Sequence, residues 1–315
     1  MSETKRNVCL VASEVAPFAK TGGLADVAAA LSRALHEEGH DVRLFLPFYP
    51  RIASADRTFV PVDFLQDVPV SSGPRSYSFS VFTTPLPGSD LPVHLVHCPA
   101  LYDRPGIYTA DGDEHLRFAV LARAALDCCQ RMGWSPDVVH CNDWHTALIP
   151  LFLKTLYAWD RLFARTRTVL TIHNIGYQGA FPESAVTDVG LDAWRDLLHQ
   201  DDLRQGAVNF LKTGILYADA ITTVSETYAR EIQTETYGVG LQGLLQGRRS
   251  TLFGIVNGID DQVWNPSTDP HLPAHYDRED LSGKRKCREE LLREMGLRPA
   301  GGGPWRGSRP GRRCR

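Results

Sequence analysis

The segment Lys20-Thr21-Gly22-Gly23-Leu24 lies between a predicted strand and a predicted helix. Residues 7–12, Asn-Val-Cys-Leu-Val-Ala, form the short apolar run that is typical of a buried strand. Beyond the two glycines, apolar side chains recur at the spacing of one helical face, at Leu24, Val27, Ala28, Leu31, Ala34 and Leu35. The segment is therefore predicted to be the loop at which the first strand of an α/β fold gives way to its first helix.

Such a loop suits a phosphate or a diphosphate. Gly22 and Gly23 let the backbone approach a ligand closely, and a helix start offers unpaired N–H groups and the positive end of the helix dipole. Lys20 adds a cation beside them. The alternative is an ordinary turn, because a Gly-Gly pair before a helix often binds nothing.

The same segment disfavours a nicotinamide-dependent enzyme. The dinucleotide fingerprint G-x-G-x-x-G follows its strand directly. In this chain a longer loop, residues 13–21, precedes a single Gly-Gly pair. An unrelated Rossmann-like oxidoreductase is therefore the least favoured interpretation of the fold.

Composition bounds the class of protein. The chain has 315 residues, a net charge of −3 and 43% apolar residues, which is enough for one large or two ordinary globular domains. The near-neutral balance does not indicate a nucleic-acid partner. No apolar run reaches the roughly 20 residues needed to cross a bilayer, and no signal-peptide core precedes the first strand. We therefore expect a cytoplasmic protein without a membrane partner.

Seven cysteines are scattered along the chain without a C-x-x-C pair. An odd number without metal-ligand spacing argues against a disulfide framework and against a zinc site. His140 and His145 have a possible metal spacing, but no third ligand is evident. We therefore predict no metal and no cofactor, and expect the cysteines to be buried small hydrophobes in a reducing compartment.

Strand-like and helix-like patterns alternate along most of the chain, which predicts a doubly wound parallel sheet of the Rossmann-like α/β class. Residues 60–96 differ, because their alternating pattern with Ser, Pro and Thr predicts an antiparallel excursion with hairpin turns. Further strands are predicted at residues 42–46, 137–140, 167–173, 220–224 and 252–257. Further helices are predicted at residues 115–132, 147–157, 210–217, from Ser225 as N-cap, and 281–297.

Polar residues collect where the predicted parallel strands end. They are Lys20 after the first strand, His140, Asn142, Asp143 and His145 around the end of the 137–140 strand, His173 and Asn174 at the end of the 167–173 strand, and Ser225 and Glu226 after the 220–224 strand. Ligands of doubly wound sheets bind at the carboxyl ends of strands. The sequence therefore predicts that these side chains gather in one site.

Four of these segments together resemble one family. They are residues 20–27 (KTGGLADV), 140–145 (HCNDWH), 171–179 (TIHNIGYQG) and 256–260 (VNGID). In order and spacing they are similar to bacterial glycogen synthase and plant starch synthase, and the resemblance runs over about residues 8–297. It implies a GT-B architecture, in which two Rossmann-like domains face each other across a cleft.

The resemblance also implies a division of the chain. Residues 1–250 are expected to be the N-terminal, acceptor-side domain, and residues 251–298 the linker and the start of the nucleotide-binding domain. Residues 299–315 are nearly all Gly, Pro and Arg, which predicts a disordered tail. The chain is thus expected to be the N-terminal half of a GT-B enzyme, weakly active or inactive alone.

Roles of single residues follow from the resemblance. It implies that Lys20, Gly22, Gly23 and Asn174 bind the nucleotide-sugar donor, and that His173 and Asp143 are catalytic. Glu14, Tyr177 and Gln178 are expected to bind the acceptor glucan, and a polar loop with Tyr102, Tyr108, Asp111 and Glu114 is a candidate lining of the glucan cleft.

The predicted function is the transfer of glucose from ADP-glucose to the non-reducing end of an α-1,4-glucan, with retention of configuration. A UDP-sugar donor is a variant of this hypothesis. A non-catalytic glucan-binding remnant of such an enzyme is the alternative. Each site residue also has a purely structural interpretation: a solvated Lys20, a core His173, and Asp143 as a helix cap.

Overall fold

The computed structural model describes residues 5–53, 57–261 and 264–297. The chain divides into two units, of which one ends at Asn257 and the other begins at Gly258. The tail predicted to be disordered, residues 299–315, lies outside the described residues. Within those residues, none of the helices is both long and apolar enough to cross a membrane.

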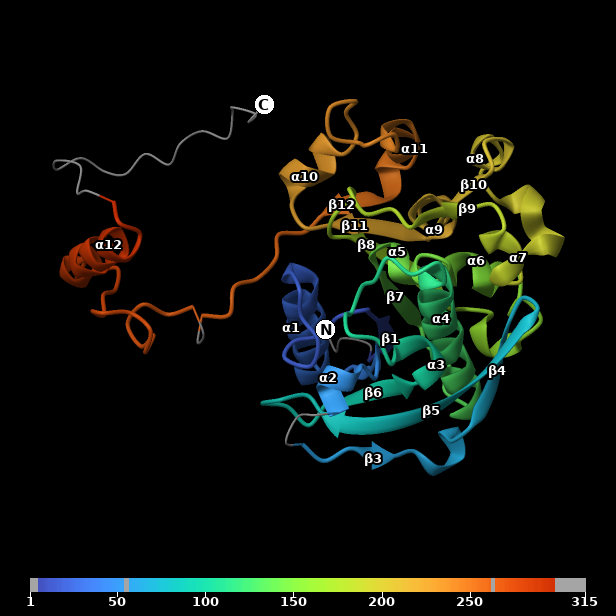
Figure 1. Cartoon of the computed structure of the whole chain (residues 1–315), viewed down its shortest axis with the longest axis horizontal. Coiled ribbons are helices and arrows are strands. Elements are labelled where there is room, and N and C mark those ends of the chain that lie inside the picture. The colour runs from blue at the N-terminus through green and yellow to red at the C-terminus, as the bar shows by residue number, and fades with distance from the viewer. Residues whose placement is uncertain (1–4, 54–56, 262–263, 298–315) are drawn as a thin grey trace. The chain divides into compact units, whose positions relative to one another are not determined.

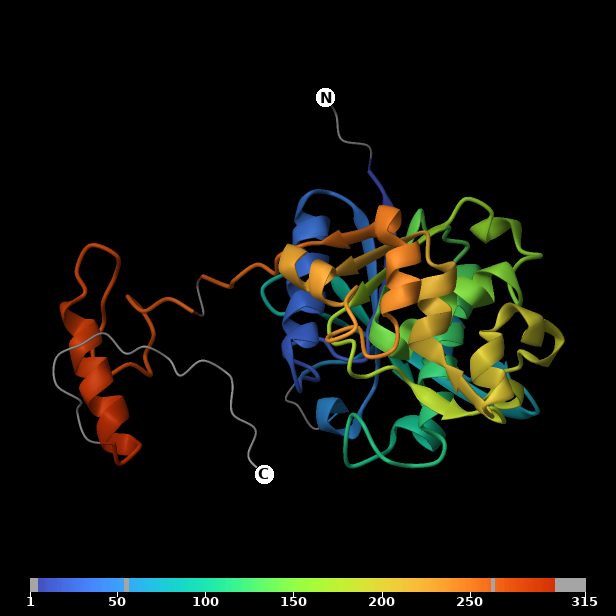
Figure 2. The ribbon, with the colours of Figure 1, turned by 90° about the horizontal axis from the view of Figure 1, so that it is seen from above.

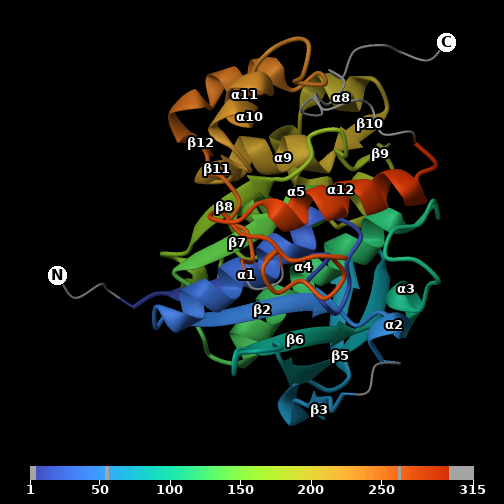
Figure 3. The ribbon, with the colours of Figure 1, turned by 90° about the vertical axis from the view of Figure 1, so that its left-hand side faces the viewer.

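The first unit is built on a ten-stranded sheet whose central strands are parallel. The order of these strands across the sheet is β12 (Leu252–Gly254), β11 (Ala220–Thr223), β8 (Arg167–Ile172), β7 (Val138–Asn142), β1 (Asn7–Val11), β2 (Asp41–Pro47) and β6 (Pro92–His97). Figure 3 labels all of them except β1, which is labelled in Figure 1. The predicted parallel α/β sheet is therefore confirmed.

An antiparallel extension completes the sheet beyond β6. It consists of β5 (Arg75–Pro85), which pairs with β6, and of β3 (Val60–Pro61) and β4 (Val68–Ser72), which both pair with β5. This confirms the antiparallel excursion predicted for residues 60–96, except that β6 itself runs parallel to β2. A separate two-stranded sheet joins β9 (Ala180–Pro182) to β10 (Ala207–Asn209).

Helices cover both faces of the sheet. Figures 1 and 2 show α1 and α4 on opposite sides of β1. The α-helices of the first unit are α1 (Gly23–Glu37), α2 (Pro50–Ala53), α3 (Pro99–Tyr102), α4 (Glu114–Arg131), α5 (Asp143–Thr146), α6 (Ile149–Lys154), α7 (Ala185–Asp188), α8 (Gln200–Arg204), α9 (Phe210–Tyr217), α10 (Glu226–Glu231) and α11 (Gln242–Gly247). The second unit contains α12 (Ser282–Glu294).

Burial explains why these segments fold as they do. Strand β1 lies between β2 and β7 and buries its side chains on both faces of the sheet, so after Asn7 it is apolar at every position rather than alternating. Helix α1 buries one stripe, made of Leu24, Ala25, Ala28, Ala29 and Ser32. The core of the first unit thus fixes both elements that flank the glycine loop.

Two predicted elements are wrong in their extent. The helix predicted at residues 147–157 is confined to α6, in whose first turn Pro150 lies, and it ends at Lys154 because the backbone of Thr155 leaves the helical conformation (φ −125°, ψ −86°). The strand predicted at residues 252–257 ends at Gly254, and Ile255 and Val256 are exposed. In contrast, Ser225 does cap α10, because its hydroxyl accepts a hydrogen bond from the Tyr228 N–H at 2.9 Å.

Candidate active site

The sheet brings the polar strand ends to one edge. Strands β1, β7, β8 and β11 are consecutive parallel neighbours, so their carboxyl ends meet at the same edge. The glycine loop follows β1, Asp143 follows β7, and His173 follows β8. This is the place at which doubly wound sheets bind their ligands.

The glycine loop leaves open space at the start of α1. Gly22 precedes the helix in an extended conformation and, as a glycine, has no side chain with which to cap the helix start. A Cβ atom at Gly22 or Gly23 would meet no other atom within 4 Å. Neither packing nor backbone conformation therefore requires glycine here, and what the two residues provide is access to the N–H groups of α1.

Lys20 lies beside this opening with its side chain half-exposed. Its ammonium group forms an ion pair with the Asp26 carboxylate at 2.7 Å. Asp26 lies in the first turn of α1, where its negative charge is favourable. A ligand anion that binds Lys20 thus has to compete with Asp26.

The Glu14 carboxylate is buried and shapes the glycine loop. Its Oε1 atom accepts hydrogen bonds from the Thr21 hydroxyl at 2.6 Å and from the Tyr108 hydroxyl at 2.5 Å. Its Oε2 atom accepts from the Thr21 N–H and, at 3.3 Å, from the Gly22 N–H. The predicted acceptor contact of Glu14 stays a prediction, and the contacts that the structure gives it are all to protein groups.

Asp143 joins the ends of β7 and β8. Its Oδ1 atom accepts hydrogen bonds from the backbone N–H groups of His173 at 2.7 Å and of Asn174 at 3.4 Å. Its φ of 53° is left-handed, which is uncommon for a residue other than glycine and is often found at functional sites. Burial, together with a smaller effect of the Glu14 charge, raises the pKa of Asp143 to about 7, against the lowering effect of these two hydrogen bonds.

His173 is held as a neutral imidazole. Its Nε2 atom lies 3.0 Å from Oδ1 of Asn142, whose Nδ2 donates to the Val11 carbonyl at 3.0 Å. Because that amide oxygen can only accept, Nε2 carries the proton. Burial lowers the pKa of His173 to about 4, although the charge of Glu14 acts in the opposite direction.

The other ring nitrogen of His173, Nδ1, therefore has a free lone pair, and no hydrogen bond reaches it from any residue that the structure describes. An unprotonated nitrogen of this kind accepts a hydrogen bond from a hydroxyl group. Asn142, which orients the ring, was assigned no role from the sequence. Its position between His140 and Asp143 at a strand end was the only signal for it.

The predicted acceptor residues behave differently from one another. Tyr177 is 68% exposed and presents a free aromatic face. Gln178 is engaged in the protein, because its Nε2 donates to the Val239 carbonyl at 2.9 Å and its Oε1 accepts from Asn209 at 2.7 Å. Asn174 is exposed, and its Oδ1 accepts from the Gly176 N–H at 2.9 Å, which shapes the turn after β8.

The two histidines with possible metal spacing lie in different surroundings. His140 hydrogen-bonds the Thr171 hydroxyl at 2.6 Å, and burial lowers its pKa to about 4. His145 is buried, with its ring against Tyr108 and Trp144. Over the described ranges, no group of three or more His, Cys, Asp or Glu residues is arranged to hold a metal ion.

A cavity of about 520 Å³ lies away from this site. It is lined in part by Asn7, Asp41 and Arg43, at the amino ends of β1 and β2. None of the predicted site residues lines it. This cavity is therefore not part of the candidate active site.

Comparisons with known proteins agree with the fold and with the motifs. Residues 7–247 match the family model of the starch synthase catalytic domain. The chain is 42% identical over 300 residues to a glycogen synthase of Syntrophotalea carbinolica, covering 92% of this chain and 60% of that protein. It is 45% identical over 295 residues to glycogen synthase 2 of Geobacter sulfurreducens, again covering 92% of this chain and 60% of the relative.

A solved structure is similar as well. It is the catalytic domain of starch synthase IV from Arabidopsis thaliana bound to ADP and acarbose, with a TM-score of 0.82 and 35% sequence identity. The match covers 95% of this chain and 61% of that one. The chain therefore spans about 60% of the length of the curated relatives it matches.

Proposed function

Because the chain belongs to the family of starch synthase catalytic domains, we propose that it forms the acceptor-side half of a glucosyltransferase. The reaction would move glucose from ADP-glucose to the non-reducing end of an α-1,4-glucan, with retention of the α configuration. The observation that carries this proposal is the contact of the Asp143 carboxylate with the His173 and Asn174 N–H groups, at the sheet edge where the charge of Glu14, from the loop after β1, acts on both Asp143 and His173.

The chemistry needs an anion site and a cation site close together. Glucosyl transfer builds negative charge on the departing diphosphate and positive charge on the sugar ring, and preorganised groups stabilise both. The N–H groups at the start of α1 and the Lys20 ammonium, once released from Asp26, suit the diphosphate. This assignment gives Gly22 and Gly23 the task of letting the diphosphate reach the backbone.

The residues that follow β7 and β8 are assigned to the contacts with the donor sugar. The ionised Asp143 carboxylate suits a developing positive charge or a hydroxyl, and Nδ1 of His173 suits a hydroxyl. Asn174, exposed beside them, has both donor and acceptor groups for the sugar. Because burial raises the pKa of Asp143 to about 7, its ionised form prevails only above that pH.

The acceptor is assigned to the exposed side chains of the same edge. The free ring of Tyr177 suits the apolar face of a glucose unit. Glu14 and Gln178 remain part of the proposed acceptor site. Because both side chains bind protein groups, we assign them to holding the site in place rather than to touching the glucan.

The test is glucosyl transfer by the chain itself and by a fusion of residues 1–297 to the remaining C-terminal part of the Geobacter sulfurreducens relative. Labelled ADP-glucose and UDP-glucose are supplied separately, with glycogen as acceptor. We expect the fusion to transfer glucose from ADP-glucose. Lys20→Ala should weaken donor use, and His173→Ala should lower turnover by about two orders of magnitude or more, as removal of a preorganised donor or acceptor does. Normal rates in both variants would disprove the site.

A non-catalytic glucan-binding remnant is the second candidate, because the chain spans only about 60% of its relatives. Affinity electrophoresis in gels that contain glycogen measures binding alone. Retarded migration together with no transfer, in the chain and in the fusion, would favour the remnant over the enzyme.

We propose a cytoplasmic location for the protein. The support is chemical: the six cysteines among the described residues are free, and five of them are buried. Free thiols persist in reducing compartments. Fractionation of the source cells, with detection by antibody, checks this, and recovery in an extracytoplasmic fraction would contradict it.

A further inference from the structure

A side chain of the loop between α3 and α4 makes contact with the glycine loop through Glu14. The Tyr108 hydroxyl lies 2.5 Å from Oε1 of Glu14 and 2.9 Å from the Ser13 hydroxyl. Glu14 in turn accepts hydrogen bonds from the N–H groups of Thr21 and Gly22. Tyr108 is therefore one contact removed from the two residues that directly precede α1, whose N–H groups the proposed diphosphate would meet.

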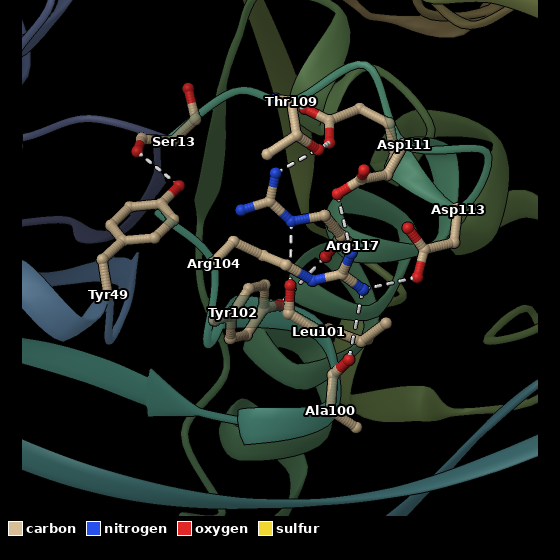
Figure 4. Close-up of polar contacts among 11 residues, drawn as sticks. Ser13, Tyr49, Ala100, Leu101, Tyr102, Arg104, Thr109, Asp111, Asp113 and Arg117 are labelled. Carbon is tan, nitrogen blue, oxygen red and sulfur yellow. Dashed lines mark hydrogen bonds and ion pairs between the residues drawn. The ribbon is translucent and has the colours of Figure 1, made fainter. Parts of the chain in front are cut away.

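Two arginines hold the loop that carries Tyr108 (Figure 4). Arg104 lies 2.7 Å from the carboxylates of both Asp111 and Asp113. Arg117, which is fully buried in α4, donates to the Leu101 carbonyl at 2.8 Å and to Glu114 at 2.7 Å. The Arg104 ion pairs join the start of this loop to its end, and the Arg117 bond joins α3 to α4 on either side of the loop.

Glu114, which pairs with Arg117, also binds the residue that follows Tyr108. Its carboxylate accepts from the hydroxyl of Thr109 at 2.7 Å and from the N–H of Thr109 at 3.2 Å. Thr109 directly follows Tyr108, so the backbone beside the tyrosine is fixed from the core. Little in the sequence indicates this arrangement, because Arg117 lies in an otherwise apolar run of the predicted helix.

Aromatic contacts fix the ring itself. It stacks on His145 with ring centroids 4.8 Å apart at 24°, and it lies 6.1 Å from Phe118. Tyr108 is 37% exposed, but desolvation of its hydroxyl and the negative charge of Glu14 beside it raise its pKa, so the hydroxyl stays protonated and donates. The hydroxyl is thus a preorganised donor aimed at one carboxylate oxygen.

We propose that Tyr108 is a positioning residue for the glycine loop: its hydroxyl orients the Glu14 carboxylate, which in turn fixes Thr21, Gly22 and the start of α1. Oε1 of Glu14 takes the two hydroxyl donors, Tyr108 and Thr21, and leaves Oε2 for the two backbone N–H groups. Without the Tyr108 donor, the carboxylate loses one of the contacts that hold it in that orientation. The N–H groups of Thr21 and Gly22 are then held less firmly. The catalytic consequence rests on the proposed function, whereas the structural consequence does not.

The first test uses the full chain and amide hydrogen exchange measured by NMR. Tyr108→Phe removes the hydroxyl and keeps the ring on His145. We expect the Thr21 and Gly22 amides to exchange about tenfold faster, which is the effect of losing one hydrogen bond to a charged group. The melting temperature should stay close to that of the wild type.

Two variants are matched controls. Ser13→Ala removes the other partner of the Tyr108 hydroxyl and leaves its bond to Glu14. Tyr217→Phe removes a tyrosine hydroxyl that donates to the Leu197 carbonyl, outside this network. Both should leave exchange at Thr21 and Gly22 unchanged. Unchanged exchange in Tyr108→Phe itself would overturn the proposal.

A double variant tests whether Tyr108 acts through Glu14. If it does, Glu14→Gln speeds exchange at the same two amides, and adding Tyr108→Phe to Glu14→Gln produces no further increase. Additive increases would mean that Tyr108 reaches the loop by another route, and would overturn the proposed mechanism.

The second readout is kinetic and uses the fusion protein described above. Tyr108→Phe should lower kcat/KM for ADP-glucose about tenfold with KM for glycogen unchanged. A raised KM for glycogen with unchanged exchange at Thr21 and Gly22 would make Tyr108 an acceptor contact instead and would overturn the inference. If the unmodified fusion transfers no glucose, the proposed function fails, while hydrogen exchange still decides the positioning role.

Discussion

At the scale of single residues, Asp143 combines features that oppose stability. It has a left-handed backbone, the residue is only 7% exposed, and the nearby charge of Glu14 opposes its ionisation. A buried carboxylate is costly unless it is paired or accepts hydrogen bonds. Two N–H groups compensate Asp143 only in part, since its pKa is still raised. We interpret this cost as one that the site tolerates for its chemistry.

We predict that Asp143→Asn stabilises the chain above neutral pH. The folded-state pKa of about 7 exceeds the unfolded value of 3.8, so the stability that this group contributes is fully present below about pH 4 and is lost as the pH rises through 7. The variant removes that loss, which amounts to at most about 4 kcal/mol. Asparagine also tolerates the left-handed backbone.

Urea unfolding of both proteins at pH 5 and at pH 8.5 checks this. The free energies of unfolding of the two proteins should be closer at pH 5, and that of the variant should be the larger at pH 8.5. A variant that is less stable than the wild type at pH 8.5 would show that Asp143 is not strained by its burial.

At the scale of elements, α9 contacts the loop that follows His173. Its N-cap is Asn209, whose Oδ1 accepts from the Lys212 N–H at 2.9 Å and whose Nδ2 donates to Gln178 in the loop after β8. Gly214 allows the helix to approach its neighbours: a Cβ atom there would lie 2.7 Å from the Ala147 Cβ and 2.8 Å from the Ala147 carbonyl. The position of the His173 loop thus depends on close packing of α9.

We predict that Gly214→Ala destabilises the chain by about 1–3 kcal/mol, the usual cost of overpacking. Helix propensity alone predicts the opposite sign, because alanine is favoured over glycine inside a helix by about 1 kcal/mol. The matched control is Gly243→Ala in α11, where a Cβ atom meets nothing within 4 Å and the propensity effect should prevail. Chemical denaturation of both variants decides between packing and propensity.

The other end of α9 is held by Arg248. Its guanidinium donates to the carbonyls of Ile215, of Leu216 at 3.1 Å, and of Ala218 at 2.5 Å. These are the carbonyls that a helix leaves unpaired at its C-terminus, where a cation is also favourable.

We predict that Arg248→Ala lowers the free energy of unfolding by about 1–3 kcal/mol, because a charged donor is lost and several carbonyls are left without it. Arg249→Ala, at an exposed neighbouring position, should change stability by less than about 0.5 kcal/mol. Equal effects of the two substitutions in urea unfolding would mean that Arg248 does not hold the end of α9.

At the scale of the whole molecule, the first unit contains the sheet, its helices and every predicted site residue. The second unit, from Gly258 onward, buries little apolar surface, with Leu292 its one buried large apolar side chain among the described residues. A unit with its own core is expected to fold independently. We propose that residues 1–250 correspond to the acceptor-side domain and residues 251–298 to the linker and the start of a second domain.

We predict that a chain ending at Asn257 unfolds cooperatively, with a melting temperature within a few degrees of that of the longer chain. The reason is that the ten-stranded sheet and its core lie entirely before this point. Thermal unfolding followed by circular dichroism measures it. A truncated chain without a cooperative transition would show that the residues after Asn257 are part of the same folding unit.

Much of this architecture was predictable because it is encoded locally. The apolar run of residues 7–12 and the helical spacing after Gly23 placed β1, the glycine loop and α1 correctly. The periodicity of a short segment reports which of its faces is buried, so it identifies helices and strands without knowledge of their partners. The predicted ends of two elements were wrong, because the chain leaves the helix at Thr155 and the strand after Gly254.

The contacts within the site depend on tertiary structure. Sequence placed Asp143 and His173 at neighbouring strand ends, but it could not show that the carboxylate accepts the His173 N–H, or that Asn142 orients the imidazole. Tyr108 and Glu14 are 94 residues apart along the chain. Such pairs are set by strand register and by loop conformation, which many distant residues determine together. The sequence by itself determined which chemical groups reach the edge of the sheet, and the tertiary structure decided which of them touch, because a hydrogen bond requires atoms to meet within about 3 Å.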